Sequence, residues 1–395
     1  MSETAQPTNT ERRLTIPEVG ELRRKTEAIS ELLRSRLVQH LDTLLTLLAP
    51  RRLLGRHLGG GAGRDVGAAT RTALESARGA LAAAGSSLDH TVSVLVLLES
   101  AADFQPMNEA YRAFWKKDFP TRTTLVTRLA TPGALVEMSM VAAEARGERV
   151  VVHPKGWAIS PSPYSYAIRS GDTVFLSGLV SRNGRDNSVV AGDVAVQTRA
   201  ILDNAGELLE AAGLSHANIV CARVYLPAVS SFGGMNEAYR SYFPSAPPAR
   251  ATARTALAGP QYDVEITFTA SSSPRHVVTE GLSPALNLPL SAAIVAGGRA
   301  YLSGALGFND TNIGNVAAQT RETLARLQRT LAAAGHAPED VAEAIVYVTD
   351  LKDLPAVDQE YHAFFGAHRP ARTTIHSGLM ASDGLVEIML TAVKR

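Results

Sequence analysis

An arginine and a glutamate recur three times in this sequence, always at the same separation. The pairs are Arg122 with Glu137, Arg250 with Glu265, and Arg372 with Glu387, each fifteen residues apart. A planar guanidinium binds a carboxylate through two parallel hydrogen bonds, and a glutamate can position or deprotonate a water molecule. The recurring residues therefore have the types needed to bind a small acid and to activate water beside it.

Other positions repeat with the same offsets. Gly85, Gly213 and Gly335 end similar alanine-rich segments, and their offsets are 213 − 85 = 128 and 335 − 213 = 122 residues. The same offsets relate Thr70, Thr198 and Thr320, and also Tyr111, Tyr239 and Tyr361. A period of about 125 residues is far longer than a solenoid or propeller unit, so each copy is expected to be a domain with its own core.

These offsets predict an N-terminal segment followed by three repeats. The boundaries are a polar tail and amphipathic helical extension over 1–58, a truncated repeat 1 over 59–148, repeat 2 over 149–274 and repeat 3 over 275–395. From Glu11 to Leu58, leucines at helical spacing stand among many arginines. We expect this helix to cover a sheet edge in repeat 1, with binding to a membrane surface or a partner as the alternative. The GGGAG run, Gly59 to Gly63, is expected to be a linker.

The periodicity within repeat 2 predicts an α+β domain. Residues 164–170 and 173–176 resemble a short hairpin, and a helix with an apolar stripe ends at Gly213. Alternating strands follow at 219–226 and 262–270, with a second helix between them. The simplest assembly is a pseudo-trimer in one chain, with three sheets turned inward around a pseudo-threefold axis and helices outside.

The composition excludes several classes of protein. Thirty-nine Lys and Arg against 38 Asp and Glu give a net charge of +1, which disfavours a dedicated nucleic-acid-binding protein. One cysteine excludes a disulfide framework and cysteine-rich metal sites, and Cys221 is expected to be a packed strand residue. The first residues contain no apolar run, so we expect no signal peptide, no membrane span and a cytoplasmic location.

Several segments of repeats 2 and 3 resemble successive motifs of the RidA family (YjgF/YER057c/UK114). In repeat 2 they are FLSGLV, VQTRAILDNAGELLEAAG, MNEAYRSYF, PPARAT and YDVEITFTA. Repeat 3 has YLSGAL, VDQEYHAFF, RPARTT and LVEIML, and repeat 1 keeps ATRTALESARGALAAAG, MNEAYRAFW, PTRTT and LVEMSM. The resemblance covers about residues 59 to 395. It implies RidA-like (chorismate mutase-like) domains, which in that family are commonly assembled as homotrimers.

The resemblance also implies a chemistry. Enzymes of the family hydrate a small imine or enamine beside a carboxylate, without metal or other cofactor, and yield a keto acid and ammonia. It gives catalytic roles to Arg250, which would hold the carboxylate, to Glu265, which would act on the water, and to Tyr164. It places around the substrate Ser177, Gly178, Asn236, Thr252, Ser303, Gly304, Arg372, Glu387, Arg122 and Glu137.

Departures from the family pattern affect repeats 1 and 3. Repeat 1 lacks the first hairpin and the SG motif; in repeat 3, Leu290 stands where Tyr164 should align, and Asp358 replaces the Asn of Asn108 and Asn236. Because clefts in this family draw residues from two subunits, we expect one or two competent clefts between repeats.

Three functions remain open at this point. The first is an imine deaminase. The second is a diverged cyclase, tautomerase, or lyase or hydrolase of specialised metabolism, since chorismatases resemble a one-chain version of this arrangement. The third is a non-catalytic protein that binds small carboxylates through Arg250. For all three we expect a small-molecule ligand and a monomer.

Overall fold

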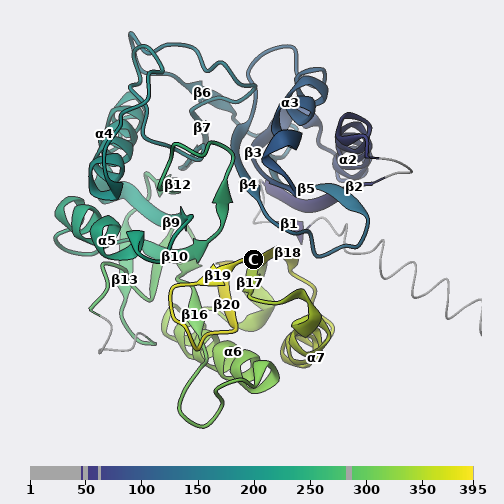
Figure 1. Ribbon diagram of the computed structural model, residues 1–395, viewed down its shortest axis with the longest axis vertical. Helices are drawn as coiled ribbons and strands as arrows, with labels where there is room; N and C mark the ends of the chain where they lie inside the picture. The colour runs from purple at the N-terminus through teal and green to yellow at the C-terminus, as the bar shows by residue number, and fades with distance from the viewer. Residues whose placement is uncertain (1–45, 48–51, 61–63, 282–286, 395) are drawn as a thin grey trace, which may run out of the picture. The chain divides into compact units, whose positions relative to one another are not determined.

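The computed structural model describes residues 46–47, 52–60, 64–281 and 287–394. Most of the expected N-terminal helix therefore lies outside the described residues. Residues Thr43–Arg395 form one compact unit. Within it, each repeat folds into a mixed sheet with two longer helices (Figure 1).

The three repeats contain similar elements in a similar order. Repeat 1 contains β1 (Thr46–Leu47), β2 (Arg52–Gly60), α2 (Val66–Ala83), β3 (Thr91–Leu98), α3 (Phe104–Arg112), β4 (Thr121–Val126) and β5 (Ala134–Ala143). Repeat 2 contains β6 (Val150–Val152), β7 (Ala167–Ser170), β8 (Thr173–Leu176), α4 (Val194–Ala211), β9 (Ile219–Leu226), α5 (Ser231–Tyr242), β10 (Ala249–Arg254), β11 (Ala256–Leu257) and β12 (Glu265–Ser271). Repeat 3 contains β13 (Arg275–Val278), β14 (Ala293–Ala296), β15 (Arg299–Leu302), β16 (Ala305–Leu306), α6 (Val316–Ala333), β17 (Val341–Val348), α7 (Leu354–Phe365), β18 (Ala371–His376), β19 (Gly378–Leu379) and β20 (Val386–Val393).

The sheets of adjacent repeats are joined at their edges. Their strand orders are β1-β2-β5-β3-β4-β11, β19-β10-β9-β12-β8-β7-β6 and β13-β14-β15-β20-β17-β18, with β16 also paired to β20. Strand β11 of repeat 2 pairs with β4 of repeat 1, and β19 of repeat 3 pairs with β10 of repeat 2. Each of these short strands covers an edge that would otherwise present unpaired backbone groups. Strands β4 and β10, which carry Arg122 and Arg250, therefore lie at the junctions between repeats.

The long helices begin and end in the same way in each repeat. At the N-terminus a short polar side chain accepts a hydrogen bond from the amide three residues on; these caps are Asp65, Asp193 and Asn315. Two residues beyond each helix stands a glycine with φ of 74°, a conformation that disfavours a side chain. These glycines are Gly85, Gly213 and Gly335. The helix predicted to end at Gly213 is therefore confirmed.

Repeat 1 differs from its prediction, because residues 52–60 form a strand. Strand β2 pairs antiparallel with β1 and β5, so the expectations of a helix through Leu58 and of a missing hairpin are wrong here. The helical spacing of the leucines fails to predict the structure of this segment. The edge of β5 needs a pairing partner, and pairing in the tertiary structure overrides the local periodicity. Gly59 belongs to this strand rather than to a linker. A Cβ atom on Gly59 would collide with the backbone of Ala69 in α2.

The sheets face inward and share one apolar cluster. One face of each sheet packs on the helices of its own repeat. The opposite faces meet in a cluster drawn from all three repeats, which includes the equivalent residues Leu97, Tyr225 and Tyr347. The predicted α+β pseudo-trimer with inward-facing sheets is thereby confirmed.

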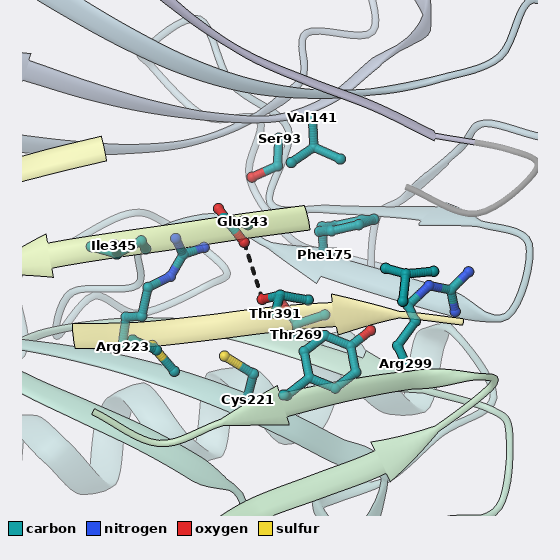
Figure 2. Close-up of a pocket in the computed structure, with 13 residues that line it drawn as sticks. Ser93, Val141, Phe175, Cys221, Arg223, Thr269, Arg299, Glu343, Ile345 and Thr391 are labelled. Atoms are coloured by element: carbon teal, nitrogen blue, oxygen red, sulfur yellow. Dashed lines mark hydrogen bonds between the residues drawn. The ribbon is translucent and has the colours of Figure 1, made fainter. Parts of the chain in front are cut away.

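A small cavity of about 50 Å³ lies where the three sheets meet. Figure 2 shows Arg223 and Glu343 among its lining side chains, and Thr391 Oγ1 donates a hydrogen bond of 3.2 Å to Glu343 Oε2. Burial acts to lower the pKa of Arg223, but Coulomb interactions with Tyr225 and Glu343 raise this pKa above its ordinary value. The repeat offsets place Leu95 at the position of Arg223. A symmetric trimer would place three copies of Arg223 here, whereas the fused chain places one, near Glu343; Arg299, which also lines the cavity, pairs with Asp172.

Removing Arg223 alone should destabilise the fold. Arg223→Leu leaves the half-buried Glu343 without this cation, which should cost about 1 to 3 kcal/mol. Adding Glu343→Ser, which copies Ser93 at the equivalent position, should recover most of that loss. Urea unfolding of the single and double variants measures both. A double variant no more stable than Arg223→Leu would show that the two charges are not coupled.

We expect the chain to be a monomer in solution. Three fused repeats satisfy the threefold interfaces internally, so no second chain is required. Static light scattering should return a mass near 41.9 kDa. A mass three times larger would instead indicate that repeats pair between chains.

Candidate functional site

A cavity of about 730 Å³ lies between repeats 2 and 3 and is called the Arg250 cavity below. Its polar lining includes Arg250 and Thr252 from β10, Ser303 and Gly304 after β15, Glu387 from β20, Arg326 and Thr330 from α6, and Asn287. Its apolar lining includes Phe232, Leu288, Leu290, Leu306, Phe308 and Met380. A few polar groups converging in an apolar pocket are typical of a small-molecule site.

Arg250 is held rigidly but keeps a free donor. Its side chain is buried, Nη2 donates to Asn236 Oδ1 at 2.7 Å, and the guanidinium lies 4.9 Å from the centre of the Tyr239 ring. Its backbone amide donates to Ser303 Oγ at 2.7 Å, and its carbonyl accepts from the Gly304 amide at 3.1 Å. Nε is buried and has no hydrogen-bond partner among the described residues. A buried donor without an acceptor is costly, which favours a ligand at this position.

Glu387 lies on the other side of the same junction. Burial raises the pKa of Glu387 to about 8, although Arg250 and a hydrogen bond from the Thr252 amide act to lower it. A Cβ atom on Gly304 would collide with Glu387 Oε1, so only glycine leaves room for this carboxyl. The carboxyl therefore holds a proton at neutral pH, close to a cation from the neighbouring repeat.

The junction between repeats 1 and 2 repeats this construction. The group formed by Arg122, Tyr164, Ser177, Gly178 and Glu265 is called the Arg122 cluster. The Arg122 amide donates to Ser177 Oγ at 2.9 Å, and the Gly178 amide donates to the Arg122 carbonyl at 3.0 Å. Burial raises the pKa of Glu265 to about 8, with Arg122 acting to lower it. A Cβ atom on Gly178 would collide with Glu265 Oε1.

The surroundings of Arg122 are more aromatic than those of Arg250. The guanidinium of Arg122 lies 5.6 Å from the ring centre of Phe104, 5.1 Å from that of Tyr111 and 5.8 Å from that of Tyr164. Burial raises the pKa of Tyr164, so its hydroxyl stays protonated. The side chain of Arg122 donates one hydrogen bond, to Met107 Sδ at 4.0 Å, and within the described ranges no oxygen accepts from it.

The junction between repeats 3 and 1 is different. There, Thr373 Oγ1 and Ser139 Oγ share a hydrogen bond. Thr373 follows Arg372 in the sequence, and Ser139 lies two residues after Glu137 on the same face of β5. Nη1 of Arg372 lies 2.8 Å from Oδ1 of Asp358, so a carboxylate of its own repeat already neutralises this arginine. Glu137 is completely buried. This third group has no free cation to offer a ligand.

The strand register also distinguishes this third junction. Leu58 pairs with Glu137 in repeat 1, and Leu306 pairs with Glu387 in repeat 3. The residue two positions before the leucine is Gly304 in repeat 3. The equivalent residue in repeat 1 is Arg56. The glycine that makes room for the carboxyl at the other two junctions is therefore replaced in repeat 1.

The thirteen predicted site residues thus fall into three groups. Arg250 meets Glu387, Asn236, Thr252, Ser303 and Gly304, whereas Glu265 and Tyr164 lie with Arg122. Within one repeat the arginine and the glutamate fifteen residues later do not meet, because β9 lies between β10 and β12. The arginine strand is at the edge of its sheet and faces the next repeat. Ser177 and Ser303 use their hydroxyls to hold the arginine backbone.

Sequence reasoning missed several residues of these groups. The sequence already marked Asn108 as the equivalent of Asn236 without giving it a site role, and the same offset of 128 residues makes Phe104 the equivalent of Phe232. Leu288 and Phe308 line the Arg250 cavity from loops. No periodic or motif signal marks them, because loop positions are set by tertiary packing.

Over the residues that the structure describes, no three His, Cys, Asp or Glu side chains gather as metal ligands would. Each helix of that same part of the chain is too short or too polar to cross a bilayer.

Known proteins with similar sequences or structures agree with the repeat pattern. The model of the Endoribonuclease L-PSP family matches residues 56–144, 158–272 and 281–394. A RutC family protein of Sulfurisphaera tokodaii is 43% identical over 90 residues, which are 23% of this chain and 72% of that protein. The 2-iminobutanoate/2-iminopropanoate deaminase of Homo sapiens is 35% identical over 112 residues, which are 28% of this chain and 82% of that protein.

A similarity at the level of the whole chain is found among solved structures. A crystal structure of a chorismatase superposes with a TM-score of 0.56 at 15% identity, covering 89% of this chain and 99% of that one. At this identity the match shows a shared fold alone. Since three successive matches to the family model cover most of its length, the chain belongs to the Endoribonuclease L-PSP (RidA/YjgF) family as a fusion of three copies.

Proposed function

We propose that the chain hydrolyses a carboxylate-bearing imine or enamine to a keto acid and ammonia in the Arg250 cavity. The observation that carries the proposal is a cavity lined both by the buried cation Arg250 and by Glu387, whose raised pKa leaves its carboxyl protonated at neutral pH. Relatives named 2-iminobutanoate/2-iminopropanoate deaminases support this reaction class.

Arg250 would bind the carboxylate of the substrate. A planar guanidinium can donate two parallel hydrogen bonds to the two carboxylate oxygens, a geometry that lysine does not reproduce. The hydrogen bond from Nη2 to Asn236 fixes the plane of the guanidinium. The imine carbon would then be held at a constant distance from Glu387 on the other wall.

Glu387 would move the protons. Its raised pKa means that it begins as an acid and protonates the imine nitrogen, which makes the adjacent carbon electrophilic. The resulting carboxylate accepts a proton as water adds to that carbon, forming a carbinolamine. The carboxyl then protonates the amino group, ammonia leaves as the C–N bond breaks, and the hydroxyl proton returns to Glu387 as the C=O bond forms. Each cycle consumes one water molecule and leaves Glu387 protonated.

The size of the Arg250 cavity favours one further candidate. A volume of about 730 Å³ lined by leucine, phenylalanine and methionine is larger than a short imino acid needs. Such a site suits a diverged cyclase, tautomerase or lyase acting on a bulky acid without ammonia release. Assays that follow ammonia and substrate loss together distinguish the two reactions. A protein that binds acids but turns over neither class would be a carboxylate-binding protein.

Two substitutions in the Arg250 cavity should have different kinetic effects. Arg250→Lys keeps the charge but loses the paired donors, so kcat/KM should fall about ten- to a hundredfold. Glu387→Gln should lower kcat while KM changes little, because proton transfer acts in the transition state. Steady-state ammonia release measures both.

Arg254→Lys is the matched control, since Arg254 is exposed at the end of the same strand. It should leave the rate unchanged. A folded and fully active Arg250→Lys variant would remove the Arg250 cavity from the mechanism.

The stability of the fold should depend on pH through Glu387. Its native pKa is about 8, whereas a glutamate in an unfolded chain has a pKa of about 4.3. Its contribution is fully present below about pH 4.3 and declines as the pH rises to about 8, because only the unfolded chain releases the proton in that interval. Glutamine does not titrate, so Glu387→Gln should be more stable than the parent at about pH 8.5, by roughly 1 to 4 kcal/mol.

Urea unfolding at about pH 8.5 and about pH 4.5 tests this dependence. The difference in free energy of unfolding between Glu387→Gln and the parent should be smaller at about pH 4.5 than at about pH 8.5. An advantage independent of pH would mean that Glu387 is ionised in the native state.

A further inference from the structure

We propose that the α6 wall of the Arg250 cavity is an anion subsite, centred on Arg326, which makes the cavity selective for acids that carry a second carboxylate. The inference rests on the proposed function for the first carboxylate, which Arg250 would hold. It goes further because it assigns the second carboxylate to a residue outside the repeated arginine and glutamate pairs.

Arg326 belongs to α6 and lines the same cavity as Arg250. Its Nη1 donates a hydrogen bond of 2.6 Å to the carbonyl of Leu306 on β16. Two residues earlier, the Gly304 amide donates to the Arg250 carbonyl. Residues two apart in an extended segment are separated by about 7 Å. The two arginines are therefore anchored at neighbouring points of one segment, and a ligand in the cavity can meet both.

Arg326 keeps donors that a ligand could use. Nε donates to Glu322 Oε1 at 2.9 Å, and Nη1 donates to Leu306. Within the part of the chain that the structure describes, no residue accepts a hydrogen bond from Nη2. The side chain is 30% exposed, so its two partners hold it in place without enclosing it. A guanidinium that is already oriented loses little freedom when it binds a carboxylate.

The charges around Arg326 do not cancel. Glu322 lies 2.9 Å from Arg326 Nε and 3.4 Å from Arg329 Nη2. One carboxylate thus faces two guanidiniums, and this group of three keeps one positive charge. Glu387 also lines the cavity, but burial raises its pKa to about 8, so it adds no negative charge at neutral pH. The ligand therefore meets two positive charges, one at Arg250 and one at Arg326.

This charge distribution favours a dicarboxylic acid. Each carboxylate of such a ligand carries one negative charge and would face one excess positive charge. A phosphate carries about 1.5 to 2 negative charges at one end, which exceeds the charge left over at Arg326. Leu288, Phe308 and Leu327 also line the cavity and can contact an aliphatic chain between the two acid groups.

The equivalent positions of the other repeats carry no charge. The repeat offsets place Asn204 in repeat 2 and Ser76 in repeat 1 where repeat 3 has Arg326. Asn204 donates a hydrogen bond to the carbonyl of Arg182 in the segment after β8. A neutral amide is thus enough to hold the long helix to that segment. Because the packing of the helix does not require a cation, we assign the charge of Arg326 to ligand binding.

The test compares keto acids that differ in the second carboxylate alone. The probes are 2-oxoadipate against 2-oxohexanoate, and 2-oxoglutarate against 2-oxopentanoate, with each Kd measured by isothermal titration calorimetry at neutral pH. At least one diacid should bind about tenfold more tightly than its monoacid counterpart, as one charged hydrogen bond to a partly exposed group would give. Higher ionic strength should reduce this preference, because Arg326 is partly exposed.

Three variants place the effect at Arg326. Arg326→Gln removes the charge but keeps an amide, so it should weaken binding of the preferred diacid about tenfold and leave the monoacid unchanged. Arg329→Gln is the matched control, because Arg329 also pairs with Glu322 but is 61% exposed and lies outside the cavity lining. It should change the Kd of either acid less than about twofold. Arg250→Lys should weaken binding of the same diacid, and thermal unfolding checks that each variant is folded.

The outcomes separate this inference from the proposed function. Equal affinity for both members of each pair would overturn the inference. So would an Arg326→Gln variant that weakens both acids by the same factor, since Arg326 would then shape the cavity rather than bind a carboxylate. If the diacid preference depends on Arg326 but no imine releases ammonia, the subsite stands and the deaminase proposal fails. If ammonia is released but no diacid is preferred, the deaminase proposal stands and the subsite fails.

Discussion

The burial of an arginine at two of the three junctions between repeats is the constraint on which the structure depends. Each guanidinium is packed chiefly by side chains of its own repeat, whereas the following repeat holds the backbone of Arg122 and Arg250. A serine hydroxyl from that repeat accepts the arginine amide, and a glycine amide donates to its carbonyl. The glutamate of the same repeat lies beneath this glycine. Neither charged group could be accommodated by one repeat alone.

This constraint links folding with function. The strand carrying the arginine must be at the edge of its sheet, so that it can face the neighbouring repeat, and short strands β11 and β19 protect the exposed part of that edge. The same edge position keeps the arginine away from the glutamate of its own repeat. Low polarity at the junction raises the glutamate pKa toward neutrality, which is the condition for a carboxyl that gives and takes protons. The packing of adjacent repeats and the raised glutamate pKa values therefore have one physical origin.

Fusion of the repeats removes the requirement that the junctions be identical. In a homotrimer, a change that suits one junction is imposed on all three. In this chain Asp358 neutralises Arg372 at one junction, Tyr164 packs near Arg122 at a second, and Leu290 lines the cavity at the third. The cavity where the sheets meet shows the same freedom, since it contains a single Arg223. The three junctions have thereby become chemically distinct.

The sequence by itself determined the repeats, the α+β class and the residue types of the site. Recurring offsets and the alternation of strands and helices are local properties of the chain, so Arg250 and Glu387 could be named as candidates without coordinates. The grouping of Arg250 with Glu387 rather than Glu265 was decided by the tertiary structure, because it follows from the order of strands in a sheet. Residues 52–60 likewise form strand β2 because they pair with the edge of β5, although their leucine spacing is typical of a helix. Partners across a junction depend on how repeats pack, and no spacing within one repeat encodes that.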